Sequence, residues 1–311
     1  MDLTYISRIA DRSSFYYRKY TIEKKSGGFR EIYQPSAELK TLQYWVVHNV
    51  LCALPISEEA CAYNKGNSIK KHAEKHQKSK FLFHTDIRNF FPSIHMSHLA
   101  PILRANKGIF DKLGLDLEQS IQNIGKICFK SDSLCIGTVS SPIISNIIMY
   151  AFDVQMAEYC KAKNYIYTRY ADDIYISSNN FIPIDIVSFI ASNLSQNGFT
   201  INSGKTKFYS TKYRRKITGL IITHDGKVSV GLQKRNEIKK MVYDKFHDGE
   251  ISDIDYVTLC EAIEKREEEI ERQEEEVKKK AKPKYDSIVI SIILLILSTI
   301  LIYFLVYYFF S

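Results

Sequence analysis

The stretch that decides the fold runs from residue 164 to residue 178 and reads NYIYTRYADDIYISS. Aromatic and β-branched residues, which are typical of strands, lie on both sides of one acidic pair, Asp172-Asp173. Two such runs around a short polar break predict a β-hairpin whose tip holds the acids. Adjacent carboxylates repel one another, so the pair is costly unless water or cations neutralise it. An ordinary solvated turn would explain the pair if it stood alone.

A third carboxylate favours a functional interpretation. FLFHTDIRNFF (81–91) is an apolar, strand-like run that reaches an acid at Asp86, and Pro92 begins a new element. Three carboxylates at the ends of adjacent strands would form an oxygen-rich site suited to two Mg²⁺ ions. One ion would lower the pKa of an attacking sugar hydroxyl, and the other would steady a triphosphate and its leaving pyrophosphate. The predicted reaction is nucleotidyl transfer.

The remaining pattern predicts a mixed α/β chain. TIEKKSGGFREIYQP alternates around Gly27-Gly28 as a hairpin does, and Pro35 closes it. Apolar residues then recur with helical spacing from Leu39 to Val50. Further along, the chain is predicted to form helices over 95–127, 145–163 and 183–197, a loop containing Gly137 and Pro142, strands over 216–223 and 227–230 around Asp225-Gly226, and a helix from 231.

Five motifs between residues 15 and 230 resemble those of reverse transcriptases, in the order of that family. TIEKKSGGFREIYQPSAELKTLQ is similar to the fingers motif, DIRNFFPSI to the first catalytic motif, and IGTVSSPIISNIIM to the motif that supports the template and the incoming nucleotide. YADD is similar to the second catalytic motif, and GFTINSGKTKF to the next motif with its lysine. One match would be weak, but five in order at fitting spacing are not expected by chance.

The resemblance implies a role for individual residues. It makes Asp86, Asp172 and Asp173 the catalytic metal ligands, with the carbonyl of Ile87 as a further ligand. The implied nucleotide-binding residues are Arg30, which folds over the triphosphate, Phe91, which excludes a 2′-hydroxyl, Gly137, which shapes the pocket with Pro142, and Lys205, which approaches the leaving phosphate, with Lys207 as the alternative. A core aromatic position beside Phe90 would explain Phe91 equally simply.

Two further elements resemble the retron branch of the bacterial reverse transcriptases. The stretch 72–76, HAEKH, stands where retron enzymes carry asparagine-alanine-x-x-histidine, so His72 departs from that pattern. Ile217-Thr218-Gly219 stands in place of valine-threonine-glycine. The resemblance implies RNA contacts from His72, His76, Thr218 and Gly219. Without the resemblance, the histidines would be read as ordinary surface residues and Gly219 as a glycine at the end of a strand.

The charge distribution fits a polyanionic partner. The chain has 311 residues and a formal net charge of +8, and its first 260 residues hold 35 basic and 25 acidic side chains, a net +10. Its hydrophobic content of 45% excludes a disordered chain and a small disulfide-stapled protein. The six cysteines form no CxxC pair, so we expect reduced core thiols.

The C-terminal region differs from the rest. Residues 261–286 hold ten acidic and eight basic side chains, which favours a solvated helical spacer over a coiled coil. Residues 287–310, SIVISIILLILSTILIYFLVYYFF, carry no charge, and 24 helical residues extend about 36 Å, enough to cross a bilayer. The preceding KKKAKPK predicts that the catalytic part is cytoplasmic, with a single-pass C-terminal anchor in the inner (cytoplasmic) membrane. The span could also act on the membrane as an effector.

The resemblance implies a right-hand polymerase fold of the α/β (α+β) class. The expected divisions are fingers over 1–80, palm over 81–224 with a fingers insertion at 95–135, the start of a helical thumb over 225–255, a charged helical spacer over 256–286 and a transmembrane helix over 287–310. Only GLQKRNEIKKMVYDKF (231–246) resembles the start of the retron thumb, so the completeness of the thumb stays open and RNA recognition by its distal part is not implied.

The implied function is that of a retron RNA-directed DNA polymerase. It would use dNTPs and two Mg²⁺ ions to copy a structured non-coding partner RNA, priming from a guanosine 2′-hydroxyl, into RNA-linked single-stranded DNA (msDNA) for defence against phage. One alternative is a non-retron defence or abortive-infection reverse transcriptase. Another, of a different class, is a membrane-tethered RNA-binding scaffold with an inactive site. The sequence leaves open whether the chain forms a homo-oligomer.

Overall fold

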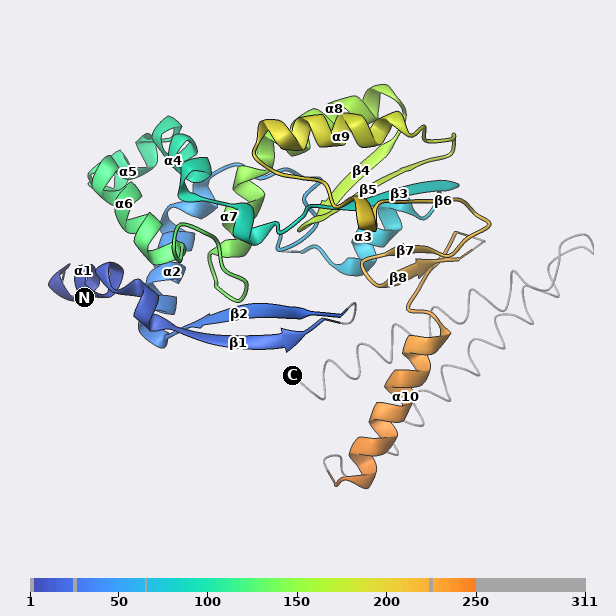
Figure 1. Cartoon of the computed structure of the whole chain (residues 1–311), viewed down its shortest axis with the longest axis horizontal. Coiled ribbons are helices and arrows are strands. Elements are labelled where there is room, and N and C mark those ends of the chain that lie inside the picture. The colour runs from blue at the N-terminus through green and yellow to red at the C-terminus, as the bar shows by residue number, and fades with distance from the viewer. Residues whose placement is uncertain (1–2, 25–26, 65, 224–225, 250–311) are drawn as a thin grey trace, which may run out of the picture. The chain divides into compact units, whose positions relative to one another are not determined.

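The computed structural model describes residues 3–24, 27–64, 66–223 and 226–249 (Figure 1). Its elements in chain order are α1 (Leu3–Asp11), β1 (Tyr17–Glu23), β2 (Phe29–Pro35), α2 (Ala37–Asn49), α3 (Ile69–His76), β3 (Phe81–Asp86), α4 (Met96–Ala105), α5 (Gly108–Leu113), α6 (Leu117–Cys128), α7 (Ser141–Ile148), α8 (Tyr150–Ala162), β4 (Ile166–Tyr170), β5 (Asp173–Ser178), α9 (Asp185–Gln196), β6 (Lys207–Tyr209), β7 (Arg215–Ile217), β8 (Leu220–Ile222), β9 (Val228–Ser229) and α10 (Leu232–His247). The predicted mixture of helices and strands is confirmed.

The chain divides into two compact units. The first comprises Met1–Asn67, Phe83–Ser177 and Phe181–Phe208, and the second comprises Ser68–Leu82, Ser178–Asn180 and the chain from Tyr209.

A four-stranded sheet in the order β4-β5-β3-β6 forms the centre of the first unit. The hairpin predicted over 164–178 is confirmed, because β4 and β5 pair antiparallel from Ile166↔Ser177 to Tyr170↔Asp173. Helices α8 and α9 lie side by side over one face of the sheet (Figure 1). The middle of both strands is buried on consecutive residues, so both faces of the sheet are covered there and α8 and α9 account for one of them.

The second predicted hairpin is also confirmed. Strands β1 and β2 pair antiparallel over their whole length, from Tyr17↔Pro35 to Glu23↔Phe29, and form a two-stranded sheet. Helix α2 follows directly, and its first turn is capped because the Ser36 hydroxyl accepts from the Leu39 N–H at 3.3 Å. The stretch predicted as helical over 95–127 forms α4, α5 and α6.

One helix begins earlier than the sequence pattern predicts. Helix α7 starts at Ser141 rather than at 145, so Pro142 lies in its first turn and not in the preceding loop. Proline is well tolerated there, because the first N–H groups of a helix have no intrahelical acceptor. The predicted helix 145–163 is also interrupted at Met149, between α7 and α8.

In the second unit, α3 packs against a three-stranded sheet of order β7-β8-β9. The strand predicted over 216–223 is wrong in one respect, because Thr218 and Gly219 form a two-residue turn between β7 and β8. Both have positive φ, 44° and 91°, as the favoured two-residue hairpin turns require. Asp225, of the next predicted turn, lies outside the described residues.

Several predictions concern the chain beyond the described residues. Within the described ranges, no helix is both long enough and apolar enough to cross a membrane. The spacer predicted over 256–286 and the span predicted over 287–310 lie outside those ranges. Of the described cysteines, which are free thiols, Cys61, Cys128, Cys135 and Cys160 are buried, but Cys52 is exposed and so is not a core thiol.

Candidate active site

The acidic pair occupies the tip of the β4–β5 hairpin. Tyr170 pairs with Asp173, so Ala171 and Asp172 form the turn between the strands. Ala171 is left-handed, with φ of 56°, a conformation that residues other than glycine rarely adopt. The sequence thus places both carboxylates at the end of the sheet. The left-handed conformation of Ala171 beside them must be stabilised by contacts with neighbouring groups.

Asp86 joins this pair at the end of β3. The Ile87 N–H donates to the Asp172 carbonyl at 2.9 Å, which ties the end of β3 to the turn. Asp86 is 3% exposed, and its carboxylate accepts from Asn202 Nδ2 at 2.9 Å and from Lys205 Nζ at 2.6 Å. The structure therefore brings Asp86, Asp172 and Lys205, all singled out from the sequence, to one place.

The charges of this site shift its pKa values. Burial, followed by the charges of Asp173 and Asp86, raises the pKa of Asp172 to about 6. Burial of the Lys205 ammonium opposes its charge, but the Asp86 hydrogen bond and the surrounding carboxylates outweigh that effect and raise its pKa. The site thus carries an excess of negative charge, which one lysine only partly neutralises.

Asp173 has a different partner. His84 Nε2 lies 2.7 Å from Asp173 Oδ1, and the His84 ring stacks on Tyr175 with 4.6 Å between ring centroids. His84 stands two residues before Asp86 on β3, and the sequence analysis did not single it out.

The donor set is suited to a divalent cation. Carboxylate oxygens are the ligands that Mg²⁺ prefers, and the raised pKa of Asp172 marks a charge that a cation would relieve. In the part of the chain that the structure describes, no three His, Cys, Asp or Glu side chains are arranged around a common ion position. Lys205 Nζ and Asn202 Nδ2 hold Asp86 instead, so ion binding would require Lys205 to move.

The predicted nucleotide-binding residues lie on several elements of the first unit. Arg30 is exposed on β2, opposite Ile22. Burial and then the charge of Asp172 raise the pKa of Tyr63, whereas Arg169 and Arg30 act in the opposite direction. Arg30 and Asp172 therefore both lie within electrostatic range of Tyr63.

Phe91 and Phe90 take different positions. Phe90 is 3% exposed and packs on Phe199, whereas Phe91 is only half-buried, with its ring edge against Phe90. The core aromatic is therefore Phe90, which leaves Phe91 accessible for the predicted contact with a sugar.

Gly137 lies where the loop before α7 meets β2. Its φ is 102°, and a Cβ at this position would lie 2.6 Å from Ile32 Cγ2 and 3.1 Å from the Tyr33 carbonyl oxygen. The Tyr33 N–H donates to the Ile136 carbonyl at 2.8 Å. Only glycine allows the loop to lie this close to the strand.

The predicted RNA-binding residues belong to the second unit. His72 and His76 are each 1% exposed, so the expectation of surface histidines is wrong. Burial, followed by the charge of Lys75, lowers the pKa of His72 to about 3, and burial lowers that of His76 as well. Thr218 Oγ1 lies 3.4 Å from His72 Nδ1, so His72 and the Thr218-Gly219 turn support each other within the unit.

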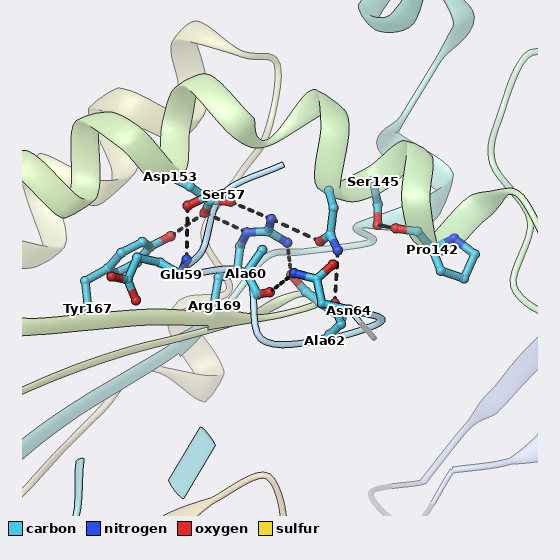
Figure 2. Close-up of polar contacts among 12 residues, drawn as sticks. Ser57, Glu59, Ala60, Ala62, Asn64, Pro142, Ser145, Asp153, Tyr167 and Arg169 are labelled. Atoms are coloured by element: carbon cyan, nitrogen blue, oxygen red, sulfur yellow. Dashed lines mark hydrogen bonds and ion pairs between the residues drawn. The ribbon is translucent and has the colours of Figure 1, made fainter. Parts of the chain in front are cut away.

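A buried charged pair beside the turn is the main feature that the sequence analysis missed (Figure 2). Arg169 and Asp153 have fully buried side chains and form an ion pair at 2.6 Å. A charged residue inside the apolar strand that leads to the acidic pair was the available signal, because a buried charge requires a partner. Nothing in the local sequence identifies Asp153 as that partner.

Comparisons with known proteins identify the family of this chain. The family model described as reverse transcriptase (RNA-dependent DNA polymerase) matches residues 22–222. The Retron Ec86 reverse transcriptase of Escherichia coli is 37% identical over 251 residues, which cover 79% of this chain and 74% of that protein. The Retron Ec83 reverse transcriptase of Escherichia coli is 29% identical over 265 residues, which cover 79% of this chain and 81% of that protein.

A solved structure of telomerase from Candida albicans aligns with a TM-score of 0.48 and 13% identity, over 72% of this chain and 48% of that one. The family match covers most of the chain and includes all three carboxylates, Arg30 and Lys205. Members of this family generally use divalent metal ions. The chain belongs to the reverse transcriptases, is of the retron type, and is an RNA-directed DNA polymerase.

Proposed function

We propose that this reverse transcriptase copies part of a structured non-coding RNA into single-stranded DNA that stays linked to the RNA, starting from a guanosine 2′-hydroxyl. The observation that carries the proposal is the convergence of Asp86, Asp172 and Lys205 at one sheet end in a chain similar to retron enzymes. The product, msDNA, would serve in defence against phage.

Asp86, Asp172 and Asp173 would hold two Mg²⁺ ions, with the Ile87 carbonyl as a further ligand. Bound there, the ions would supply activation of the attacking hydroxyl and neutralisation of the triphosphate. Before they bind, Lys205 Nζ must leave Asp86 Oδ2, 2.6 Å away. The Lys205 side chain is 54% exposed, so it is free to turn towards a leaving pyrophosphate.

Other residues would select and hold the nucleotide. Arg30 on β2 would contact the triphosphate, since its planar guanidinium suits phosphate oxygens. Phe91 would lie under the sugar and exclude a 2′-hydroxyl. Gly137 keeps the loop before α7 against β2, which would bring the two sides of the nucleotide pocket together.

The basic body would hold the RNA through its phosphates. The net charge of +10 over the first 260 residues supports binding of a template–product duplex. The protein would recognise the phosphates and the shape of this duplex, which do not depend on its base sequence. His72, His76, Thr218 and Gly219 would contribute by shaping the RNA-facing part of the second unit. Because both histidines are buried, their contribution would pass through the fold of that unit.

The uncharged stretch 287–310 would anchor the enzyme in the inner membrane, with the polymerase in the cytoplasm. Cell fractionation tests this directly. The full chain should sediment with membranes and resist extraction by carbonate, whereas a chain ending at residue 286 should stay in the supernatant. Identical fractionation of the two chains would contradict the anchor.

The nucleic acid that co-purifies with the full chain tests the central proposal. We expect an RNA that carries covalently attached DNA, detected by RNase digestion followed by sequencing of the remaining DNA. The control is the double variant Asp172→Asn/Asp173→Asn, which should retain the RNA without DNA. Wild-type protein that carries RNA but no attached DNA would contradict the retron function and favour a defence reverse transcriptase without a dedicated RNA.

A further inference from the structure

A buried charged cluster, drawn in Figure 2, is hydrogen-bonded to the catalytic turn through the Ala171 carbonyl. It joins Arg169 on β4 to Asp153 on α8, and both side chains are 0% exposed. Arg169 Nε donates to Asp153 Oδ1 at 2.8 Å and Nη2 donates to Oδ2 at 2.6 Å, so the contact is bidentate. The Tyr167 hydroxyl donates to the same carboxylate at 2.6 Å. Asp153 thus fixes the plane of the guanidinium.

The other donors of Arg169 reach two different segments. Nη1 donates to the Ala171 carbonyl at 2.9 Å, and Nη2 donates to Asn146 Oδ1 on α7 at 3.2 Å. Asn146 Nδ2 donates in turn to the Ala62 carbonyl at 3.0 Å. One side chain therefore connects α8, α7 and the turn that carries Asp172.

The bond to Ala171 falls on a strained point of the backbone. Ala171 is a left-handed alanine, a conformation that costs energy and persists only where neighbouring groups hold it. Its carbonyl belongs to the peptide group that links it to Asp172. Arg169 Nη1 therefore restrains the peptide plane immediately before the Asp172 side chain.

The main chain of Arg169 holds a second strained segment. Its N–H donates to the Glu59 carbonyl at 2.8 Å, and its own carbonyl accepts from the Cys61 N–H at 2.7 Å. This segment leads into Tyr63, another left-handed residue with φ of 63°. Arg169 thus lies between the Tyr63 loop and the catalytic turn, and it bonds to both segments.

Stability alone does not explain this arrangement. A buried ion pair is often no more stabilising than apolar side chains of similar volume, because both charges lose their hydration. An apolar pair could fill the same space, but it could not hold the Ala171 carbonyl. The fork of a guanidinium can bond to a carboxylate and a carbonyl in different directions, which a lysine ammonium cannot do with the same geometry.

We propose that Arg169, held in place by Asp153, is a positioning residue that fixes the Ala171-Asp172 peptide and so keeps Asp172 in place for metal binding. The inference rests on the proposed metal site and adds to it two residues that contact neither metal nor substrate. Loss of the restraint should weaken metal binding and lower kcat, because Asp172 is then held less well. The KM for dNTP should change less than kcat, because the side-chain hydrogen bonds of Arg169 go to Asp153, Ala171 and Asn146 and not to Arg30 or Phe91.

Three variants of the full chain separate positioning from stability. Arg169→Lys keeps the charge but cannot make the forked contact, and Asp153→Asn keeps the size but leaves the guanidinium less firmly held. Tyr167→Phe is the matched control, because it removes a buried hydrogen bond to Asp153 and leaves the donors of Arg169 unchanged. Mn²⁺ binding, followed by electron paramagnetic resonance without substrate, is the readout, together with Tm, kcat and KM.

We expect Arg169→Lys and Asp153→Asn to bind Mn²⁺ at least about 10-fold more weakly than wild type, with kcat lowered by a similar factor and KM for dNTP within about two-fold. Tyr167→Phe should stay within about two-fold in Mn²⁺ affinity, whatever its Tm. If Arg169→Lys does not fold, the comparison of Asp153→Asn with Tyr167→Phe decides.

Wild-type Mn²⁺ affinity in a folded Asp153→Asn or Arg169→Lys protein would overturn the proposal, since the pair would then be structural only. An equal loss of affinity in Tyr167→Phe would also overturn it. A wild-type chain that binds no Mn²⁺ would instead overturn the proposed metal site, and this inference with it, so the two failures are distinguishable.

Discussion

At the scale of single residues, the three carboxylates lie in unequal environments. Asp86 accepts from Lys205 and Asn202, and Asp173 lies 2.7 Å from His84 Nε2. Asp172 is buried and close to both other carboxylates, and these two effects raise its pKa to about 6. The site therefore holds unfavourable charge before a cation binds, as expected for a site built for catalysis rather than for stability.

Asp172→Asn tests whether the ionised Asp172 carboxylate destabilises the folded protein. The pKa of Asp172 in the folded state lies above its ordinary value, so the ionised carboxylate destabilises the fold once the pH rises from about 4 through 6. The neutral variant should be more stable than wild type at pH 7, without metal, by roughly 3 kcal/mol, and the difference should vanish below about pH 4. Urea unfolding across this range measures it.

The same variant should lose polymerase activity by at least about 100-fold, because it removes a proposed metal ligand. A variant less stable than wild type at pH 7 would contradict the charge assignment, and one with full activity would contradict the role of Asp172.

His72→Asn tests a buried histidine in the second unit. Burial lowers the pKa of His72 to about 3, so the folded protein keeps it neutral while the unfolded chain binds a proton below its ordinary pKa of 6.5. Stability should therefore fall as the pH drops below 6.5, and His72 alone accounts for about 2 kcal/mol between pH 7 and pH 5.

The asparagine cannot take up that proton, so the variant should lose correspondingly less stability between pH 7 and pH 5. Urea unfolding at the two pH values gives the comparison. Equal losses in wild type and variant would show that His72 is not held neutral by burial.

At the scale of elements, the loop before α7 and the β1–β2 hairpin act together. The Tyr33 N–H donates to the Ile136 carbonyl. At position 137 a side chain would collide with Ile32, so only glycine fits there. The hairpin that carries Arg30 is thereby held against the loop that precedes α7. The proposed nucleotide pocket, formed by both elements, would depend on this close approach.

Gly137→Ala tests that dependence. The added Cβ must displace Ile32 or the Tyr33 carbonyl, so we expect a stability loss of about 1–3 kcal/mol and a several-fold rise in the KM for dNTP. Gly28→Ala is the control, because Gly28 has a similar φ of 79° but no atom within 4 Å of the added Cβ.

The control variant should show the backbone strain without the rise in KM. Thermal unfolding and steady-state kinetics separate the two effects. Equal KM values in the two variants would mean that the contact between loop and hairpin does not shape the pocket.

Most of the helices and strands around the site could be predicted from the sequence. The hairpin around Asp172-Asp173 and the strand that ends at Asp86 follow from aromatic and β-branched runs interrupted or ended by acids. Helix α7 starts at Ser141, four residues before the predicted start, because Pro142, which is typical of loops, also fits a first helical turn. The Thr218-Gly219 turn was missed because Thr218 has high strand propensity and adopts a positive φ only in this context.

Contacts between distant segments could not be predicted. Arg169 and Asp153 lie on different elements, and only the fold of α8 onto β4 brings them together. His72 and His76 are polar residues near several lysines, so their local sequence is typical of a surface, yet one face of α3 is buried. Such burial depends on which elements pack together, and the local sequence pattern of α3 does not indicate which elements these are.

At the scale of the whole molecule, charge is distributed according to the proposed partner. The basic excess lies within the first 260 residues, the acidic excess within 261–286, and no charge within 287–310. A polymerase that holds a template–product duplex needs the first of these distributions, and a membrane anchor needs the last.

The affinity for structured RNA should therefore depend steeply on salt. If about six phosphates are neutralised, the affinity should fall by about 10³ between 50 and 200 mM salt. Filter binding across this range gives the slope, and replacement of one phosphate-contacting basic residue should reduce it by about one. A slope near zero would contradict electrostatic capture of the RNA by the basic body.

Primer extension by the purified full chain on an RNA template, with Mg²⁺ and either dNTPs or rNTPs, tests the central claim most directly. The site described here should extend the primer with dNTPs in wild type, with rNTPs far more slowly, and with neither in Asp172→Asn/Asp173→Asn. DNA synthesis of equal rate in wild type and in the double variant would contradict the assignment of Asp172 and Asp173, and with it the proposed active site.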